Sequence, residues 1–286
     1  MDPRNIDIED FTYELPDERI ARYPLPVRDS AKLLQYKNGR ISNHHFTDLP
    51  ELLPPGTLMI GNATRVIHAR LFFTTPNGKD IEIFCLDPSE PRDYQQSFSA
   101  TDTVRWKCLV GGNRKWKSGP ATLEVPIDGR KVTLTAERLN RLNKAFEIAF
   151  SWSDNSLSFG EILDAAGQIP LPPYLGRSAE ASDLERYQTV FARTEGSVAA
   201  PTAGLHISEV LMERLKQQNF NWSEVILHVG AGTFRPVSSP TIGGHEMHAE
   251  YFEVDRSFLE RLYAQLNSNQ PIVSVGTTST RCLESL

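Results

Sequence analysis

Short runs of alternating apolar and polar residues fill the middle of this 286-residue chain, and they restrict its fold more than any other feature. Between Arg65 and Ser151 the runs are separated by turn residues such as Pro76-Asn77-Gly78 and Asp128-Gly129. Alternation with a period of two places one face of a strand in a core and the other in solvent. Several such strands at regular intervals predict a small barrel or sandwich. The predicted strands cover residues 67–71, 81–86, 121–125, 131–134 and 146–150, whereas 138–144 lacks the alternation and predicts a basic loop or a helical turn.

The two ends of the chain instead mix strand and helix patterns. Asn38-Gly39 between two apolar runs is typical of a hairpin turn. The predicted helices cover 159–166, 208–218 and 256–266, and the predicted strands cover 57–60, 225–229 and 272–275. Strand and helix alternate here, which is typical of an α/β fold. We therefore predict an α/β protein of two domains: a mixed α/β body built from residues 1–66 and 152–286, and an inserted small all-β barrel domain, residues 67–151.

Composition excludes several classes of protein. No apolar stretch reaches the roughly 18 residues of a membrane span, and the N-terminus lacks a signal-peptide pattern. Three scattered cysteines, Cys85, Cys108 and Cys282, do not suit a disulfide framework, so we expect a cytoplasmic protein. The net charge is −6, yet residues 67–151 hold 13 Lys and Arg against 10 Asp and Glu. This basic island is either chance surface composition or a surface for a polyanion.

Two segments rich in glycine concentrate the candidate chemistry. The first places a predicted strand directly before Gly230-Ala231-Gly232, where a ligand could approach the backbone closely or an anion could meet its amides. It lacks the third glycine and the helix of a dinucleotide fingerprint, so a tight turn leaving a sheet is the alternative. The second, Gly196 to His206, is a loop of small residues. His206 is interpreted either as a general acid or base, or as a hydrogen-bonding group near a helix start.

The run from His245 to Glu250 allows two interpretations. Two histidines and a glutamate are common zinc ligands. The run alternates like a strand, however, and in a strand His248 and Glu250 share a face that His245 does not. A hydrogen-bonded His–Glu pair is therefore favoured over a metal site.

Aromatic and cationic residues alternate in the predicted barrel, at Trp106-Lys107 and at Arg114-Lys115-Trp116-Lys117. Proteins that hold RNA often combine these side chains. We interpret the tryptophans as core residues and the cations as candidates for function. The sequence contains no Gly-x-Ser-x-Gly elbow, Walker loop, His-Glu-x-x-His or Cys-x-x-Cys motif.

Ordered segments along nearly the whole chain resemble the S-adenosylmethionine:tRNA ribosyltransferase-isomerase family of queuosine biosynthesis. The resemblance is strongest across residues 185–193 and 196–206. The other segments that carry it are 11–16, 23–30, 62–67, 169–174, 228–236, 245–251 and 276–281.

The resemblance implies an α/β body with an inserted barrel and an unusual reaction. Ribose from S-adenosylmethionine is transferred to the aminomethyl group of 7-aminomethyl-7-deazaguanine at the tRNA wobble position. The product is epoxyqueuosine, and adenine and methionine are released. S-adenosylmethionine is thus a consumed substrate, and no metal or redox cofactor is expected. The expected partners are S-adenosylmethionine and the precursor-bearing tRNA, with no membrane, and the protein is expected to be a monomer.

Such a reaction needs a base for the carbon beside the sulfonium, assistance to the departing adenine, and a dry pocket. The titratable groups in the family-like segments, taken as catalytic candidates without assigning acid or base, are His206, His228, His245, His248 and Glu250. The candidate substrate-binding residues are Asn62, Thr64, Arg65, Tyr187, Thr202, Gly204, Gly230, Gly232, Thr233, Arg235, Thr277 and Thr278. Arg65, Arg235 and the cations of the inserted domain are candidates for phosphate contacts.

Two departures from the family pattern bear on activity. The chain has Ala63 where the family usually has Asp or Asn, which implies a lost ligand contact, and His68 where proline is common. Family members also continue beyond the position of Leu286. The alternative function is therefore a non-catalytic or diverged relative that binds RNA or a nucleoside without turnover. A methyltransferase is disfavoured, because no strand, glycine loop and helix for a nucleotide occur near the N-terminus.

Overall fold

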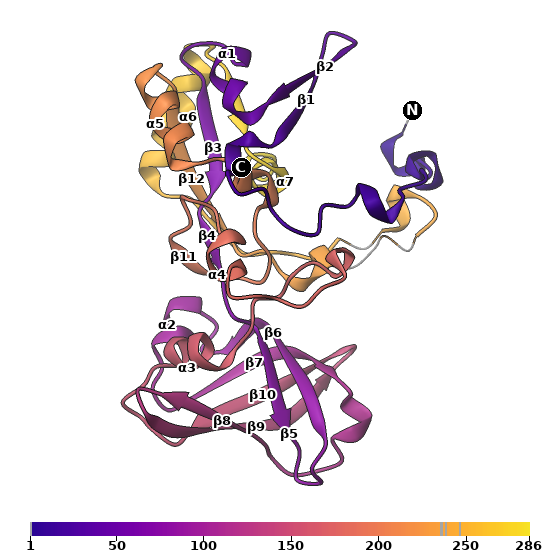
Figure 1. The fold of residues 1–286 in the computed structure, drawn as a ribbon, viewed down its shortest axis with the longest axis vertical. Coiled ribbons are helices and arrows are strands. Elements are labelled where there is room, and N and C mark those ends of the chain that lie inside the picture. Colours follow the sequence, from indigo (N-terminus) through magenta and orange to yellow (C-terminus); the bar gives the residue numbers. More distant parts are fainter. Residues whose placement is uncertain (1, 235–236, 238, 246) are drawn as a thin grey trace.

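The computed structural model describes residues 2–234, 237, 239–245 and 247–286, which fold into two parts stacked along the long axis of the molecule (Figure 1). The upper part is built from both ends of the chain, and the lower part is a barrel formed by the middle. This arrangement confirms the predicted fold class.

The lower part is a closed antiparallel barrel with the strand order β10-β7-β6-β5-β8-β9. Its strands are β5 (Arg70–Thr74), β6 (Asp80–Glu90), β7 (Thr103–Gly111), β8 (Ala121–Ile127), β9 (Arg130–Leu142) and β10 (Ala145–Trp152). Four of the predicted strands lie within β6, β8, β9 and β10, and the predicted strand 67–71 overlaps only the start of β5. The prediction for 138–144 was wrong over most of its length, because residues as far as Leu142 pair with β10 and extend β9.

One continuous core fills the barrel. Trp106 is fully buried and Trp116 is 2% exposed, which confirms their interpretation as core residues. The helices α2 (Tyr94–Ser99) and α3 (Phe159–Ala166) cover one end, and Phe159 and Ile162 of α3 belong to the same core cluster as the barrel strands. The barrel's packing thus continues past Ser151, and the predicted division of the chain at residues 66/67 and 151/152 stays a prediction.

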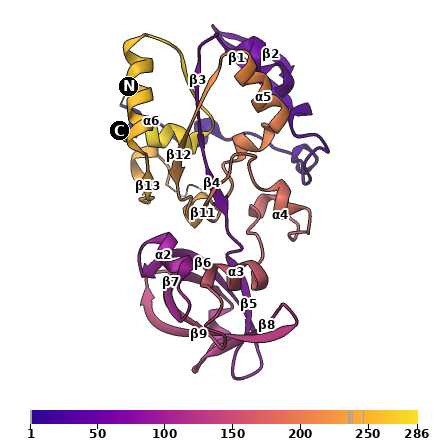
Figure 2. The same cartoon turned by 90° about the vertical axis from the view of Figure 1, so that its left-hand side faces the viewer.

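A four-stranded sheet forms the centre of the body. Its order is β13 (Phe252–Glu253), β12 (Asn221–Leu227), β3 (Leu58–Asn62) and β14 (Ile272–Ser274), with β3 parallel to both β12 and β14. All of β3 is buried, since successive side chains point to opposite faces and both faces are covered. Met59 packs with α5 (Glu209–Gln217), whereas Leu58 and Ile60 pack with α6 (Arg256–Asn267) and α7 (Thr277–Leu283). Figure 2 shows α5 and α6 on opposite sides of these strands.

The remaining elements join this body to the barrel and to the N-terminal segment. The predicted hairpin is formed by β1 (Lys32–Lys37) and β2 (Arg40–His45), with Asn38 at φ 52° and Gly39 at φ 77°. The short helices α1 (Leu49–Leu52) and α4 (Asp183–Arg186) flank the body. The chain leaves the body through β4 (Thr64–Val66), which lies parallel to β11 (Thr194–Ser197). No helix among the described residues is both long and apolar enough to span a bilayer.

Candidate functional site

A pocket of about 280 Å³ lies where the carboxyl ends of the parallel strands meet the family-like loops. Ligands of open α/β sheets bind at this edge. Five of the predicted substrate-binding residues line the pocket, together with Val229 and Ala200; the five are Tyr187, Thr202, Thr233, Thr277 and Thr278. We call this hollow the threonine pocket. The hydroxyl of Thr278 is buried and has no hydrogen-bond partner among the described residues, so the pocket holds a polar atom that a ligand could satisfy.

Gly276 shapes one wall of this pocket. It adopts φ 88°, a backbone conformation that favours glycine, and it connects β14 to α7. A Cβ atom at this position would lie 3.3 Å from Cβ of Ala203 in the opposite loop. Glycine therefore lets the start of α7 approach the loop that carries Thr202.

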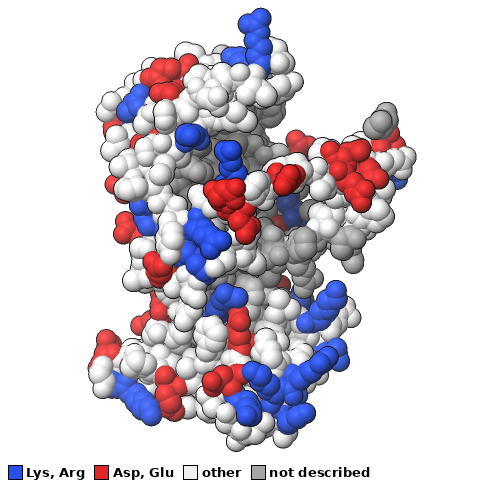
Figure 3. All heavy atoms as spheres, turned by 45° about the vertical axis from the view of Figure 1, so that its right-hand side comes forward, with Lys and Arg blue, Asp and Glu red and all other residues white. Residues whose placement is uncertain are grey.

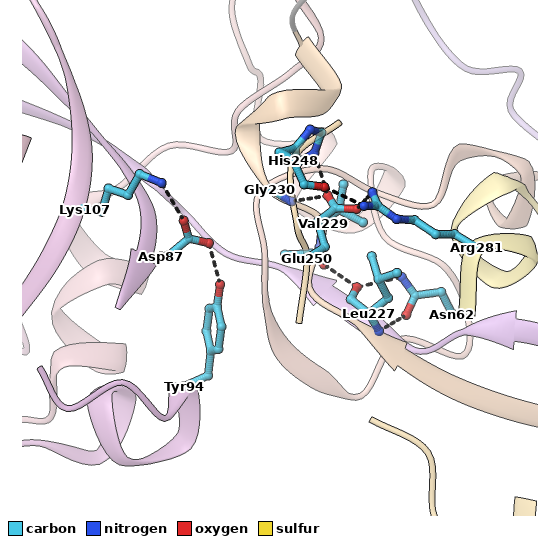
Figure 4. A network of polar contacts seen from close by, with 11 residues as sticks. Asn62, Asp87, Tyr94, Lys107, Leu227, Val229, Gly230, His248, Glu250 and Arg281 are labelled. Carbon is cyan, nitrogen blue, oxygen red and sulfur yellow. Dashed lines mark hydrogen bonds and ion pairs between the residues drawn. The ribbon is translucent and has the colours of Figure 1, made fainter. Parts of the chain in front are cut away.

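Glu250 lies at the centre of a polar network (Figure 4), which reaches Gly230, the residue after Val229 of the threonine pocket. Its Oε1 accepts a hydrogen bond of 2.9 Å from the backbone N–H of Gly230 and lies 3.3 Å from Nε2 of His248. Its Oε2 is paired with the guanidinium of Arg281, which also donates to the carbonyl of His248. The Glu250 side chain is only 7% exposed. The favoured interpretation, a hydrogen-bonded His–Glu pair, thus has its counterpart here, although residues 247–250 form no strand.

Gly232 allows this network to form. A Cβ atom on Gly232 would lie 2.2 Å from Cε1 of His248, so any other residue would displace the imidazole. A Cβ atom on Gly230 would meet only Oε1 of Glu250, at 3.8 Å, an ordinary contact. The close approach that the sequence suggested for a ligand is, at Gly232, an approach of the protein's own histidine.

His228 lies on a different hollow. The cleft between the barrel and the body has a volume of about 1010 Å³, and His228 lines it with Tyr94 and Tyr251. The imidazole is stacked on the Tyr94 ring, with centroids 4.1 Å apart and planes 7° apart. Burial lowers the pKa of His228 to about 4, so the ring is neutral at physiological pH. The next residue, Val229, lines the threonine pocket, so two neighbouring residues just beyond β12 line the two hollows.

Asn62 and Thr64 are buried and hold the strands together. Asn62 donates to the carbonyl of Leu227 at 2.9 Å and accepts from its N–H at 3.0 Å. Thr64 accepts from Ser197 at 2.7 Å, and Ser197 accepts in turn from the N–H of Val229. These side chains fix the segment that carries His228 and Val229.

The other candidates lie apart from the threonine pocket. His206 is stacked on Phe46, with centroids 4.7 Å apart, and His245 follows the turn Ile242–Gly244. Arg65 is exposed and lines a separate hollow beside Gln188. Gly204 packs against Phe191 and Thr189. Arg235 lies outside the described residues, and the roles of all the candidates stay predictions.

Two residues that were not among the candidates belong to the site: Arg281, which pairs with Glu250, and Tyr94, which lines the cleft. Arg281 is the last residue of a family-like segment, and this position was the sequence signal that could have marked it as a candidate. Tyr94 comes from the barrel, and nothing in the sequence placed it opposite His228. Among the described residues no group of three or more His, Cys, Asp or Glu could hold a metal ion.

The fold and the site define a two-part α/β protein with a candidate ligand pocket at the carboxyl ends of its parallel strands. Residues 8–286 match the sequence profile of a family described as "Queuosine biosynthesis protein". This chain belongs to that family.

Two relatives illustrate the match. A protein of Halothermothrix orenii named S-adenosylmethionine:tRNA ribosyltransferase-isomerase is 38% identical over 281 residues, which are 97% of this chain and 76% of the relative. A crystal structure of the S-adenosylmethionine tRNA ribosyltransferase of Thermotoga maritima is similar at 26% identity with a TM-score of 0.41, over 96% of this chain and 72% of that one.

Proposed function

We propose that this chain is an S-adenosylmethionine:tRNA ribosyltransferase-isomerase. It transfers and isomerises the ribosyl group of S-adenosylmethionine onto 7-aminomethyl-7-deazaguanine at the tRNA wobble position, giving epoxyqueuosine with release of adenine and methionine. Family membership and the 38% identical relative support this function and do not favour a non-catalytic relative. The structural observation that carries it is the convergence of five predicted substrate residues, from separate segments, on one pocket beside Glu250.

His248 is suited to act as the base in this reaction. When Nε2 carries the ring proton and donates it to Glu250, Nδ1 keeps a lone pair that can accept a proton from the carbon beside the sulfonium. Glu250 is itself held by Arg281 and by the Gly230 N–H, so it orients the imidazole. The threonine pocket takes S-adenosylmethionine in this proposal, as a substrate that is consumed and with no resident cofactor.

The tRNA approaches from the cleft that His228 and Tyr94 line, with the wobble base splayed out of the anticodon loop. We further propose a cytoplasmic monomer. The three cysteines are buried thiols that suit a reducing compartment.

The test is an incubation with labelled S-adenosylmethionine and precursor-bearing tRNA, followed by analysis of free adenine and of the tRNA. We expect adenine release and ribosylated tRNA. Binding of both substrates without turnover would instead identify a non-catalytic relative, and S-adenosylhomocysteine as product would identify a methyltransferase.

Variants locate the chemistry within the same assay. We expect His248→Ala and Glu250→Gln to lower the single-turnover rate by at least about 100-fold, the usual effect of losing an oriented base. His245→Ala is the matched control, because this ring has no partner among the described residues, and its rate is expected to stay within about 3-fold of wild type. Equal rates for alanine variants at all five candidate positions would overturn this location of the chemistry.

A further inference from the structure

The connections at one end of the barrel bring together residues from three separate segments. The antiparallel register pairs Glu82 with Gly111 and Phe146 with Cys108, so the β5–β6, β7–β8 and β9–β10 connections share one end. The amide of Asn77 in the first connection donates to the carbonyl of Lys115 in the second, at 3.3 Å. The helices α2 and α3 come directly after β6 and β10 and therefore lie at the other end of the barrel. The end with the three connections is the one that these helices leave uncovered. We call it the loop end.

The loop end is strongly cationic. Seven cations lie on its connections and the adjoining strand, none has an ion pair in the described part of the chain, and all except half-buried Arg138 are exposed; they are Lys79, Arg114, Lys115, Lys117, Arg138, Arg141 and Lys144. Figure 3 shows blue spheres gathered over this part of the barrel. The nearby acids Asp80, Glu82 and Glu147 already accept hydrogen bonds from the protein.

The cations elsewhere on the barrel are mostly neutralised. Arg105 pairs with Glu90 and Lys107 with Asp87. Further ion pairs join Arg70 to Glu82, Arg130 to Asp154 and Lys131 to Glu124. The positive charge predicted for the inserted segment is therefore concentrated at the loop end, on a protein whose net charge is −6.

One of the loop-end cations is held in place. The guanidinium of Arg138 lies over Trp116 and Phe146, 5.3 and 5.4 Å from their ring centroids. Arg138 lines a shallow hollow of about 400 Å³ together with Asn113, Asn140 and Arg141. A fixed guanidinium beside amides and a second arginine provides planar N–H groups that can donate hydrogen bonds to phosphate oxygens.

We propose that the loop end binds the phosphodiester backbone of the tRNA, at a distance from the reacting base. This proposal rests on the proposed function, which supplies a polyanionic substrate. The loop end would give affinity and position the tRNA without reading its sequence, while the wobble base enters the cleft at the other side of the barrel.

The test compares two triple variants with the same change of charge. The first is Arg114→Gln/Arg141→Gln/Lys144→Gln at the loop end, and the second replaces three paired cations, Arg105→Gln/Arg130→Gln/Lys131→Gln. Binding of fluorescently labelled tRNA is measured between 50 and 200 mM salt (roughly the range over which affinity based on phosphate contacts falls by orders of magnitude). We expect the loop-end variant alone to bind at least about 10-fold more weakly and to lower the slope of log K against log salt by about 2.

Further measurements separate this proposal from the proposed function. S-adenosylmethionine binding and the single-turnover rate at saturating tRNA are expected to be unchanged in the loop-end variant. Protection of Lys79, Lys115, Lys117 and Lys144 from acetylation by bound tRNA provides a readout that does not depend on a variant. Equal weakening in both triple variants, or unchanged tRNA affinity without protection, would overturn the proposal. If the wild type released no adenine, the proposed enzymatic activity would be refuted. The proposal that the loop end binds RNA would not be refuted by that result.

Discussion

Two glycines of this chain, Gly196 and Gly232, each lie against a histidine ring that a larger residue would displace. A Cβ atom on Gly196 would lie 2.3 Å from Nδ1 of His228, and one on Gly232 would lie 2.2 Å from Cε1 of His248. The sequence predicts only that something approaches the backbone closely at these glycines. Which group does so depends on contacts made between distant segments, and no local pattern contains that information.

His228 makes the stability of the protein depend on pH. Its pKa is about 4 in the folded chain and about 6.5 when unfolded. Between these values the unfolded chain binds a proton that the folded chain excludes, so stability rises with pH across this window and is complete above it. We expect a loss of up to about 3 kcal/mol on acidification from pH 7 to pH 4.

Urea unfolding at several pH values measures this loss, with His228→Phe as the control. Phenylalanine keeps a ring against Tyr94 but cannot be protonated. The wild type should lose more stability than the variant between pH 6.5 and pH 4. Parallel profiles would show that His228 does not titrate in this way.

At the scale of elements, a side chain holds two parallel strands together where each ends. Asn62 at the end of β3 bonds both backbone groups of Leu227 at the end of β12. In Asn62→Ala the Leu227 carbonyl keeps the hydroxyl of Thr64, but its N–H loses its partner. We expect a loss of about 2 kcal/mol, the cost of one buried unsatisfied donor.

The midpoint of urea unfolding tests this expectation, with Asn43→Ala on the exposed hairpin as a control that should change stability by less than about 0.5 kcal/mol. Asn62 was predicted from the sequence to bind substrate. An unchanged midpoint together with weakened S-adenosylmethionine binding would support that role over the structural one.

The sequence predicted elements well where burial was one-sided. The alternation of β6 and β10 and the helical spacing of α3 and α6 were recognised with ends within a few residues. β7 has the same alternation, with Val104, Trp106 and Cys108 buried, but no strand was predicted there. Its cations were instead interpreted as candidates for function. Residues 139–142 are exposed, and only pairing with β10 makes them a strand.

The candidate site was predictable in part, because several of its residues lie in segments that resemble the family. Tyr187, Thr202, Thr233, Thr277 and Thr278 lie in segments that were recognised by resemblance, and the fold gathers them in one pocket. His206 and His245 come from the same segments, yet the His206 ring is stacked on Phe46, and His245 follows a turn that contacts the N-terminal part of the chain. The direction of a side chain in a loop depends on tertiary packing, which sequence spacing does not encode.

At the scale of the whole molecule, the two parts have separate hydrophobic cores. Phe150 belongs to the core of the barrel, and Phe258 to a core of the body. Two parts with separate cores need not unfold together. We therefore expect calorimetry to resolve two transitions.

Core variants assign the transitions. Phe150→Ala should lower one transition temperature and Phe258→Ala the other, each through a cost of about 3–5 kcal/mol. S-adenosylmethionine should raise only the transition that Phe258→Ala lowers, because the pocket proposed for it lies in the body. A single transition lowered by both variants would mean that the two parts unfold as one unit.

The insertion of the barrel into the body also sets an order of events on the ribosome. The hydrogen bonds between Asn62 and Leu227 cannot form until Leu227 has been synthesised, 165 residues further along the chain. At roughly 5–20 residues per second, that delay is about 10–30 s. During this time β3 has been synthesised, but its neighbours β12 and β14 have not. Apart from Asn62, the residues of β3 are apolar on both faces. The barrel can close first, while β3 stays an apolar segment of the nascent chain without its partner strands.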